Sequence, residues 1–189
     1  MKHQTLLVTA ALALLLFASC KKEVTNKVPV NGDYLPMQVG NYWEIQDFIK
    51  YNITGTKIID NKTYYIFVQE SDTSYYRNYD NKIYVRRSNT VESVKFDLTA
   101  NTGSKWEFID RGTAWNVTMS SKTDTITINN TKIPNCYNFF FDIPMGADDE
   151  HSIWLAPGIG FINMTCGFCA YPSLKLRKAS INNVEITFP

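Results

Sequence analysis

The residues best suited to chemistry gather around His151, the only histidine after His3. The acidic residues Asp148, Asp149 and Glu150 directly precede it, and carboxylates with an imidazole are groups that bind metal ions. Adjacent residues of an extended chain point to opposite sides, so four consecutive side chains rarely converge on one ion. We therefore expect a solvated turn between two strands here and no metal site.

Three cysteines, Cys136, Cys166 and Cys169, form a second candidate set. In an exported chain, which the N-terminus predicts, cysteines tend to pair, and three can form at most one bridge within the chain. In a meander, Cys136 would begin one strand and Cys166 would end another that runs the same way, which places these two at opposite ends. We therefore predict a disulfide between Cys166 and Cys169.

Two chemical alternatives for these cysteines stay open. A redox-active Cys-x-x-Cys pair needs a lowered thiol pKa, usually at the N-terminus of a helix, and no obvious helix follows Cys169. A zinc site from Cys136, His151, Cys166 and Cys169 has the right number of ligands. Its spacing matches no recognised zinc finger, however, and an oxidising compartment opposes it. We expect neither of these sites.

Other enzyme signatures are missing from the sequence. It contains no Gly-x-Ser-x-Gly motif, and His151 would have to serve any serine–histidine pair. Gly103-Ser104-Lys105 lacks the rest of a phosphate-binding loop, and Gly158-Ile159-Gly160 is half of a dinucleotide-binding fingerprint. We therefore expect no catalytic residue and no cofactor, and we interpret the protein as non-catalytic.

Aromatic residues are the remaining surplus, at 14% of the chain. The tyrosines that fall within about two hairpins are Tyr64, Tyr65, Tyr75, Tyr76, Tyr79 and Tyr84. They could line a cavity or form a stacking platform for a lipid or a glycan. They could also belong to a sheet that is buried on both faces, where large β-forming residues are common. We favour the buried sheet and keep a lipid or a glycan as a candidate ligand.

The elements that must position these residues are strands. Apolar and polar residues alternate from residue 34 onward, which is typical of strands with one buried face. Examples are Trp43 with Ile45, Ile83 with Val85, Val94 with Phe96 and Leu98, and Phe139 with Phe141. Pairs such as Asp60-Asn61 and Asp80-Asn81 separate the runs, as in hairpins. We predict a single all-β domain over residues 34–189, an antiparallel meander of about ten to thirteen strands forming an open or closed barrel or a two-sheet sandwich.

Residues 1–19 have the three parts of an export signal. Lys2 gives a positive start, Leu6 to Phe17 form an apolar run, and the small residues Ala18 and Ser19 follow. The run is shorter than the roughly 20 apolar residues of a permanent membrane helix. It lies within the range of about 7–15 residues that signal peptides use. We predict that residues 1–19 are removed on export.

The junction Phe17-Ala18-Ser19-Cys20 resembles the lipobox of bacterial lipoproteins. This resemblance implies a diacylglycerol on the thiol of Cys20 and cleavage directly before it. Lys21-Lys22-Glu23 resembles the segment that follows this cysteine in lipoproteins of Bacteroidota. Two further motifs, Gly40-Asn41-Tyr42-Trp43 and Ala156-Pro157-Gly158-Ile159-Gly160, resemble parts of β-rich lipoproteins of that group, which implies an all-β fold and supplies no activity.

The lipobox resemblance implies a protein anchored in the cell envelope, where we expect the outer membrane and leave the side open. Two or more acyl chains, such as palmitate, anchor stably, and we interpret residues 20–33 as a flexible tether with a reach of about 45 Å. Apart from Lys2, the Lys and Arg residues balance the 18 Asp and Glu residues, so no basic surface indicates nucleic acid.

These features favour a membrane-tethered binding or accessory module that performs no catalysis. The main alternative is a structural or assembly component of an envelope complex, and a hydrolase or redox enzyme is a more distant one. The membrane, reached through the lipid on Cys20, is the one partner that the sequence indicates.

Overall fold

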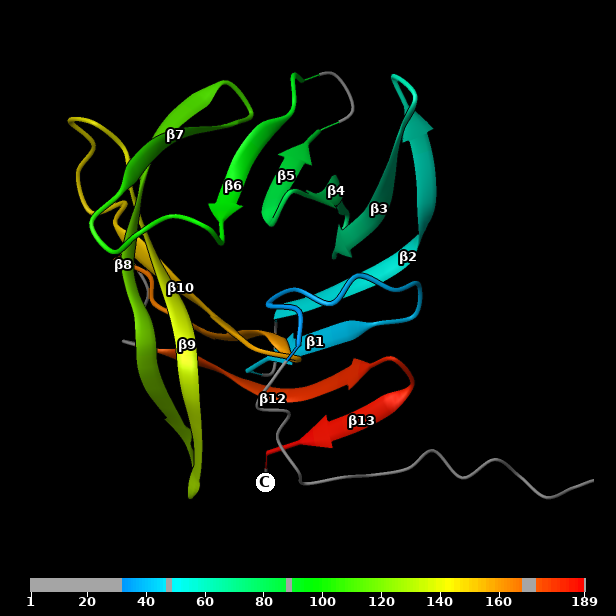
Figure 1. Ribbon diagram of the computed structural model, residues 1–189, viewed down its shortest axis with the longest axis vertical. Coiled ribbons are helices and arrows are strands. Elements are labelled where there is room, and N and C mark those ends of the chain that lie inside the picture. Colours follow the sequence, from blue (N-terminus) through cyan, green and yellow to red (C-terminus); the bar gives the residue numbers. More distant parts are fainter. Residues whose placement is uncertain (1–31, 47–48, 88–89, 168–172, 189) are drawn as a thin grey trace, which may run out of the picture.

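The computed structural model describes residues 32–46, 49–87, 90–167 and 173–188 (Figure 1). They form a single 13-stranded sheet in which every pairing is antiparallel. The all-β prediction is therefore confirmed. Within these ranges, no helix has the length and hydrophobicity needed to span a bilayer.

The strands of the first half lead from the interior of the sheet to one margin. They are β1 (Tyr42–Ile45), β2 (Ile49–Ile59), β3 (Lys62–Gln69), β4 (Asp72–Tyr79), β5 (Lys82–Arg86) and β6 (Ser93–Asp97). The second half returns from the other margin. It contains β7 (Lys105–Asp110), β8 (Thr113–Ile128), β9 (Thr131–Asp142), β10 (His151–Ala156), β11 (Gly160–Met164), β12 (Leu174–Ile181) and β13 (Val184–Thr187).

The sheet is a meander that curls into a nearly closed barrel (Figure 1). Consecutive strands pair with each other from β1 through β6, and again from β7 through β13. β1 also pairs with β12, so the first and last parts of the chain are joined by backbone hydrogen bonds. The ladder is interrupted between β6 and β7, in the middle of the chain. The predicted meander is confirmed, and of the three forms left open the structure adopts the barrel.

Side chains bridge the seam between β6 and β7. The indole nitrogen of Trp106 donates to the Val94 carbonyl at 3.0 Å, and the Ile109 amide donates to the Ser93 hydroxyl at 3.0 Å. At the same margin, the guanidinium of Arg87 lies 2.9 Å from the carboxylate of Asp110. The barrel is therefore closed here by individual contacts in place of a ladder.

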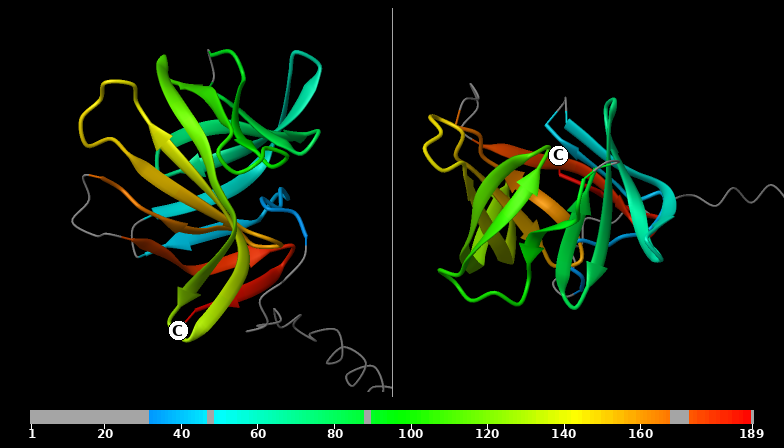
Figure 2. Two further views of the ribbon diagram at one scale, coloured as in Figure 1. Left: turned by 60° about the vertical axis from the view of Figure 1, so that its left-hand side comes forward. Right: turned by 90° about the horizontal axis from the view of Figure 1, so that it is seen from above.

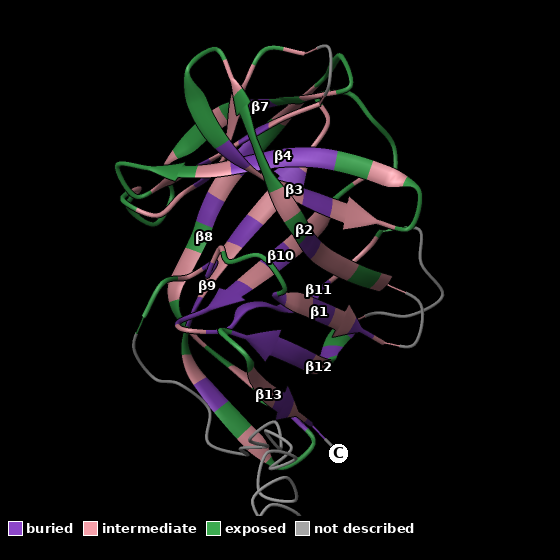
Figure 3. Cartoon of the chain, turned by 90° about the vertical axis from the view of Figure 1, so that its right-hand side faces the viewer, coloured by how far each residue is buried: buried purple, intermediate pink, exposed green. Residues whose placement is uncertain are grey.

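The core fills the barrel with the inward-facing residues of successive strands. Aromatic rings form its centre: Phe67 packs on Tyr76 with ring centroids 4.1 Å apart, and Phe96 packs on Phe139 at 4.9 Å. Figure 3 shows buried residues along β12 and in the middle of β4, with exposed residues concentrated in the turns. Burial of these large apolar side chains is the main source of folding free energy.

The two ends of the barrel differ. Because neighbouring strands are antiparallel, successive connections alternate between the ends. We call the end that carries residues 32–41 and the turn 157–159 the closed end, because Leu35 and Ile159 are buried there. The loop 143–150 and residues 165–167 lie at the other end, which we call the open end. The left view of Figure 2 shows residues 32–41 and the loop 143–150 on opposite sides of the barrel.

The two motifs that suggested β-rich lipoproteins meet at the closed end. The indole nitrogen of Trp43 donates to the Ile159 carbonyl at 2.5 Å. A β-carbon on Gly160 would lie 2.9 Å from that nitrogen, so the ring occupies the space that only glycine leaves free. Asn41 is buried as well; its side-chain amide donates to the Pro36 carbonyl at 3.0 Å and its oxygen accepts from the Asn182 amide at 2.8 Å. Both motifs therefore have structural roles.

Replacing Gly160 by alanine should destabilise the fold more than the same change at Gly40. Both glycines have φ of 95°, where a β-carbon costs about 1–2 kcal/mol. The β-carbon at Gly40 would meet nothing within 4 Å, whereas the one at Gly160 would collide with the fully buried Trp43. We expect Gly160→Ala to lower the free energy of unfolding by about 1–3 kcal/mol more than Gly40→Ala, measured by urea denaturation. Equal losses would contradict this account of the closed end.

Candidate functional site

A pocket of about 390 Å³ lies inside the open end of the barrel. Its walls come from strands on both sides of the seam and from the loops around the open end. The residues that line it are Ile49, Tyr51, Lys95, Trp115, Asp148, Asp149, His151, Ile153, Met164, Thr165, Cys166, Gly167 and Leu174. We call it the open-end pocket. Its surface is mostly apolar, with a few polar groups, which is typical of small-molecule sites.

A β-bulge places Lys95 in this pocket. On β5 and β6, Ile83 lies opposite Phe96 and the next residue, Tyr84, lies opposite Val94, so Lys95 is the extra residue of the bulge. A bulge re-aims side chains, so Lys95 and its neighbour Phe96 both face the interior. The ammonium of Lys95 donates to the Tyr76 hydroxyl at 3.3 Å and lies 5.5 Å from the centre of the Phe96 ring.

The positive charge of Lys95 has no acidic partner. Within the described ranges, no carboxylate forms an ion pair with it. The acidic groups whose charges act on Lys95, Asp110 and Asp72, are both paired with Arg87, at 2.9 and 2.5 Å. Burial lowers the pKa of Lys95, because the charged form loses its hydration. The pocket therefore holds a partly desolvated cation.

Tyr51 supplies a second polar group to the pocket. Its ring stacks on Phe161 with centroids 4.9 Å apart, and no described residue forms a hydrogen bond with its hydroxyl. Burial raises the pKa of Tyr51 to about 12, while the positive charge of Lys95 acts in the opposite direction. Both side chains line the open-end pocket. The Tyr51 phenol is therefore neutral at physiological pH, and its hydroxyl can donate a hydrogen bond to a ligand.

His151 and Trp115 form an aromatic wall of the pocket. The imidazole of His151 stacks on Phe141 with centroids 4.8 Å apart and meets the Trp115 ring edge-on at 5.1 Å. Burial lowers the pKa of His151, so the ring is neutral at pH 7. Its Nδ1 atom lies 3.2 Å from the Asp149 carbonyl oxygen, which can only accept and so favours the proton on Nδ1. His151 is held here mainly as a packing group.

The acidic run before His151 lies in the turn between β9 and β10. Asp148 and Glu150 are exposed, and Asp149 accepts a hydrogen bond from the Ile143 amide at 2.5 Å. Asp149 therefore stabilises its own loop. Over the ranges that the structure covers, no three His, Cys, Asp or Glu side chains are placed so that they could hold a metal ion.

The cysteines have different environments. Cys136 is a fully buried free thiol in the first half of β9, where burial raises its pKa to about 11. Cys166 lines the open-end pocket and is disulfide-bonded. Cys169 and Cys20 lie outside the described residues, so the bridge between Cys166 and Cys169 and the lipid on Cys20 stay predictions. Burial makes Cys136 an unreactive thiol under native conditions.

The tyrosine cluster divides between the two faces of the sheet. Tyr76 belongs to the core, while its neighbour Tyr75 points outward and lies beneath the ammonium of Lys57 at 5.2 Å. Tyr84 lies against the guanidinium of Arg77 at 4.3 Å, also on the outer face. The tyrosines therefore do not form one ligand platform. This part of the sheet is covered on both faces, as the preferred interpretation of the sequence expected.

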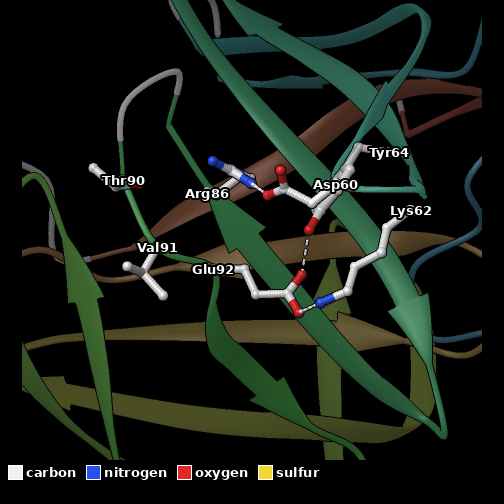
Figure 4. A pocket seen from close by; sticks show the side chains of 7 residues that line it. All are labelled: Asp60, Lys62, Tyr64, Arg86, Thr90, Val91 and Glu92. Carbon is white, nitrogen blue, oxygen red and sulfur yellow. Dashed lines mark hydrogen bonds and ion pairs between the residues drawn. The ribbon is translucent and has the colours of Figure 1, made fainter.

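A second pocket, of about 410 Å³, lies over the outer face of β3 and β5, beside residues 90–92 (Figure 4). Glu92 is its organising group. The carboxylate accepts hydrogen bonds from Tyr64, from Lys62 at 2.6 Å and from Arg77 at 2.6 and 2.8 Å. Arg86 pairs with Asp60 at 2.8 Å in the same pocket. Since these charges satisfy one another, we interpret the cluster as a clamp that holds residues 90–92 against the sheet.

Comparison with known proteins leaves the site to be interpreted from its geometry. No model of a known protein family matches this chain, and no curated protein or solved structure matches it. The pocket residues and their contacts are therefore the basis for a functional proposal.

Reasoning from the sequence missed two polar groups that line the pocket, Tyr51 and Lys95. Strict alternation put Val94 on the same face as Phe96 and Lys95 on the opposite one. That prediction is wrong at Val94, because the bulge shifts the register by one residue. No signal in the sequence marks this bulge.

The clamp around Glu92 should make the protein sensitive to acid. Hydrogen bonds from Arg77, followed by those from Lys62 and Tyr64, lower the pKa of Glu92 from 4.5 to about 2. The stabilisation is present above the unfolded-state pKa and is lost as the pH falls from about 4.5 towards 2, and it amounts to about 3 kcal/mol. We expect Glu92→Gln to be less stable than the unmodified protein at pH 7, with the difference shrinking over this window in urea denaturation.

Glu107→Gln is the matched control, because Glu107 is exposed on β7. Its stability should follow that of the unmodified protein at every pH. If the free energy of unfolding of Glu92→Gln differed from that of the unmodified protein by the same amount from pH 7 to pH 2, the role assigned to the carboxylate would be contradicted.

Proposed function

We propose that this protein is a membrane-tethered, non-catalytic binding module that takes a small amphipathic molecule into the open-end pocket. One observation carries the proposal: apolar walls surround a pocket in which Lys95 and Tyr51 offer donors that no described acidic group uses. Binding pockets for small molecules combine apolar surface with a few placed polar groups in this way. The proposed role is to hold such a molecule at the envelope.

The composition of the pocket explains why binding is favoured over chemistry. His151 stacks on Phe141, and its Nδ1 proton faces a backbone carbonyl. Asp149 is engaged by the backbone of its own loop. A general acid or base must instead be free to exchange a proton with a substrate. The groups left to meet a ligand, Lys95 and Tyr51, are donors that fix its orientation.

The position of the pocket fits a tethered protein. Residue 32, the first described residue, lies at the closed end, where the Asp33 carbonyl accepts from the Gly158 amide at 2.9 Å. The pocket lies at the opposite end of the barrel, where the loop 143–150 and residues 165–167 contribute to its lining. With a lipid on Cys20, the tether over residues 20–33 would join the barrel at the end opposite to the pocket, which leaves the pocket accessible from the aqueous side. We propose that the ligand arrives from the aqueous side.

Binding can be tested with the uncharged fluorescent probe N-phenyl-1-naphthylamine and the full chain carrying Cys20→Ser, which cannot be acylated. We expect saturable binding that Ile49→Trp weakens at least tenfold, because Ile49 lines the pocket and indole would fill its mouth. Ile58→Trp on the same strand is the control, since Ile58 is 72% exposed and lies outside the pocket. Binding that responds equally to both substitutions, or no binding at all, would count against the proposal.

The tether has its own test. We expect the native protein to begin at Cys20 and to carry the mass of a diacylglycerol, with or without a further acyl chain. Cys20→Ser should remove this mass and release the protein from the membrane, because a protein without acyl chains loses its anchor. Intact mass spectrometry and membrane fractionation measure the two effects. A bare Cys20, or a chain that retains residues 1–19, would contradict the lipoprotein assignment.

A further inference from the structure

We infer that the ligand of the open-end pocket is an amphiphile with one chain or ring system and a single anionic head group, which binds to Lys95 and Tyr51. This inference rests on the proposed function and adds the chemistry of the ligand. It follows from the charge, the polar partners and the size of the pocket, taken in turn.

The unpaired charge of Lys95 favours an anionic ligand. Lys95 extends from the bulge into the interior, and its only hydrogen bond among the described residues goes to a neutral group, the Tyr76 hydroxyl at 3.3 Å. Burying a cation without an acidic partner costs free energy, and an anion placed beside it would recover that cost. A cationic head group would meet repulsion, and a neutral one would leave the charge unsatisfied. An anionic head group is therefore the best match.

The other charged groups around the pocket leave Lys95 available. Arg87 neutralises Asp72 and Asp110, and Arg111 reaches Asp72 at 2.7 Å. At the mouth, Asp149 is held by the Ile143 amide, and Asp148 is exposed to water. One oxygen of the Asp149 carboxylate is thus bonded within its loop and the other, Oδ1, is buried without a hydrogen-bond partner among the described residues, while Asp148 is solvated. Lys95 is the cation inside this pocket that a ligand can neutralise.

Tyr51 complements Lys95 as a hydrogen-bond donor. Its hydroxyl has no hydrogen-bond partner among the described residues, and Tyr51 and Lys95 both line the open-end pocket. A carboxylate or a phosphate monoester has several acceptor oxygens and can bind both donors together. An alcohol offers one oxygen and gains less from this arrangement.

The size of the pocket limits the rest of the ligand. A volume of about 390 Å³ is near the lower end of the range of about 300–1,000 Å³ for small-molecule sites. The apolar part of the ligand would contact Ile153, Met164 and Leu174, with Trp115 on one side. This space suits one short chain or a compact ring system. A phospholipid with two long chains would not fit.

A head-group series at constant chain length tests the inference. We would titrate decanoate, decyl phosphate, 1-decanol and decyltrimethylammonium into the full chain carrying Cys20→Ser by isothermal calorimetry. We expect the anions to bind at least tenfold more tightly than 1-decanol and the cation to bind most weakly. The ratio of the dissociation constants of decanoate and decyl phosphate shows whether the site prefers a carboxylate or a phosphate head group.

Substitutions assign the effect to Lys95. Lys95→Met should abolish the preference for anions while 1-decanol still binds, and Lys95→Arg should retain most of the preference. Lys105→Met on the neighbouring strand is the matched control, because Lys105 is exposed, and it should change nothing. Tyr51→Phe should weaken the binding of decanoate by a smaller factor than Lys95→Met does.

The outcomes separate this inference from the proposed function. If decanoate and 1-decanol bind equally and Ile49→Trp blocks both, the pocket is a binding site but the anionic head group is wrong. If the anion preference survives Lys95→Met, the assignment to Lys95 is wrong. If no compound, including the uncharged naphthylamine probe, binds in a way that Ile49→Trp blocks, the proposed function itself fails.

Discussion

The contact between the Trp43 indole and the Gly160 backbone joins the beginning of the sheet to its second half. Trp43 lies on β1 and Gly160 begins β11, so the contact links parts of the chain that are far apart in sequence. It is fully buried, and the indole nitrogen is satisfied by the Ile159 carbonyl. A ring of this size can lie flat against a backbone only where no β-carbon intervenes. Closure of the barrel at this end therefore depends on the large side chain of Trp43 and on the absence of a side chain at Gly160. β1, which carries Trp43, also pairs with β12.

This closure has a consequence for the opposite side of the barrel. The first and last parts of the sheet are joined by backbone hydrogen bonds between β1 and β12, and the break in the ladder falls in mid-chain, between β6 and β7. β6 is short, contains a bulge and is held to β7 by side chains such as Trp106. Edge strands and bulges are common beside functional sites, because backbone groups there are less constrained by a ladder. Lys95 lies on this margin, so the seam and the polar part of the pocket arise from the same feature.

Much of the fold follows from alternation in the sequence, and the candidate site does not. Phe139 and Phe141 share the buried face that a period of two predicts, and turns form at Asp60-Asn61 and Asp80-Asn81, where all four residues have positive φ. Alternation cannot distinguish a barrel from a sandwich, since both bury one face of each strand; that choice depends on pairings between distant strands, such as β1 with β12. The site was missed because a single extra residue in β6 reverses the face on which Lys95 lies.

Lys95 also connects stability with binding. A lysine that faces the interior without an acidic partner makes folding less favourable than an apolar residue of similar length would, because its charge is desolvated. The outer face of the same half of the barrel contrasts with this, since Arg77 and Glu92 neutralise each other there. Among the described residues, Arg77 and Glu92 are therefore paired on the outer face, whereas Lys95 has no acidic partner at the pocket. An anion bound to Lys95 would complete the pairing, so ligand binding and folding free energy would be linked through this side chain.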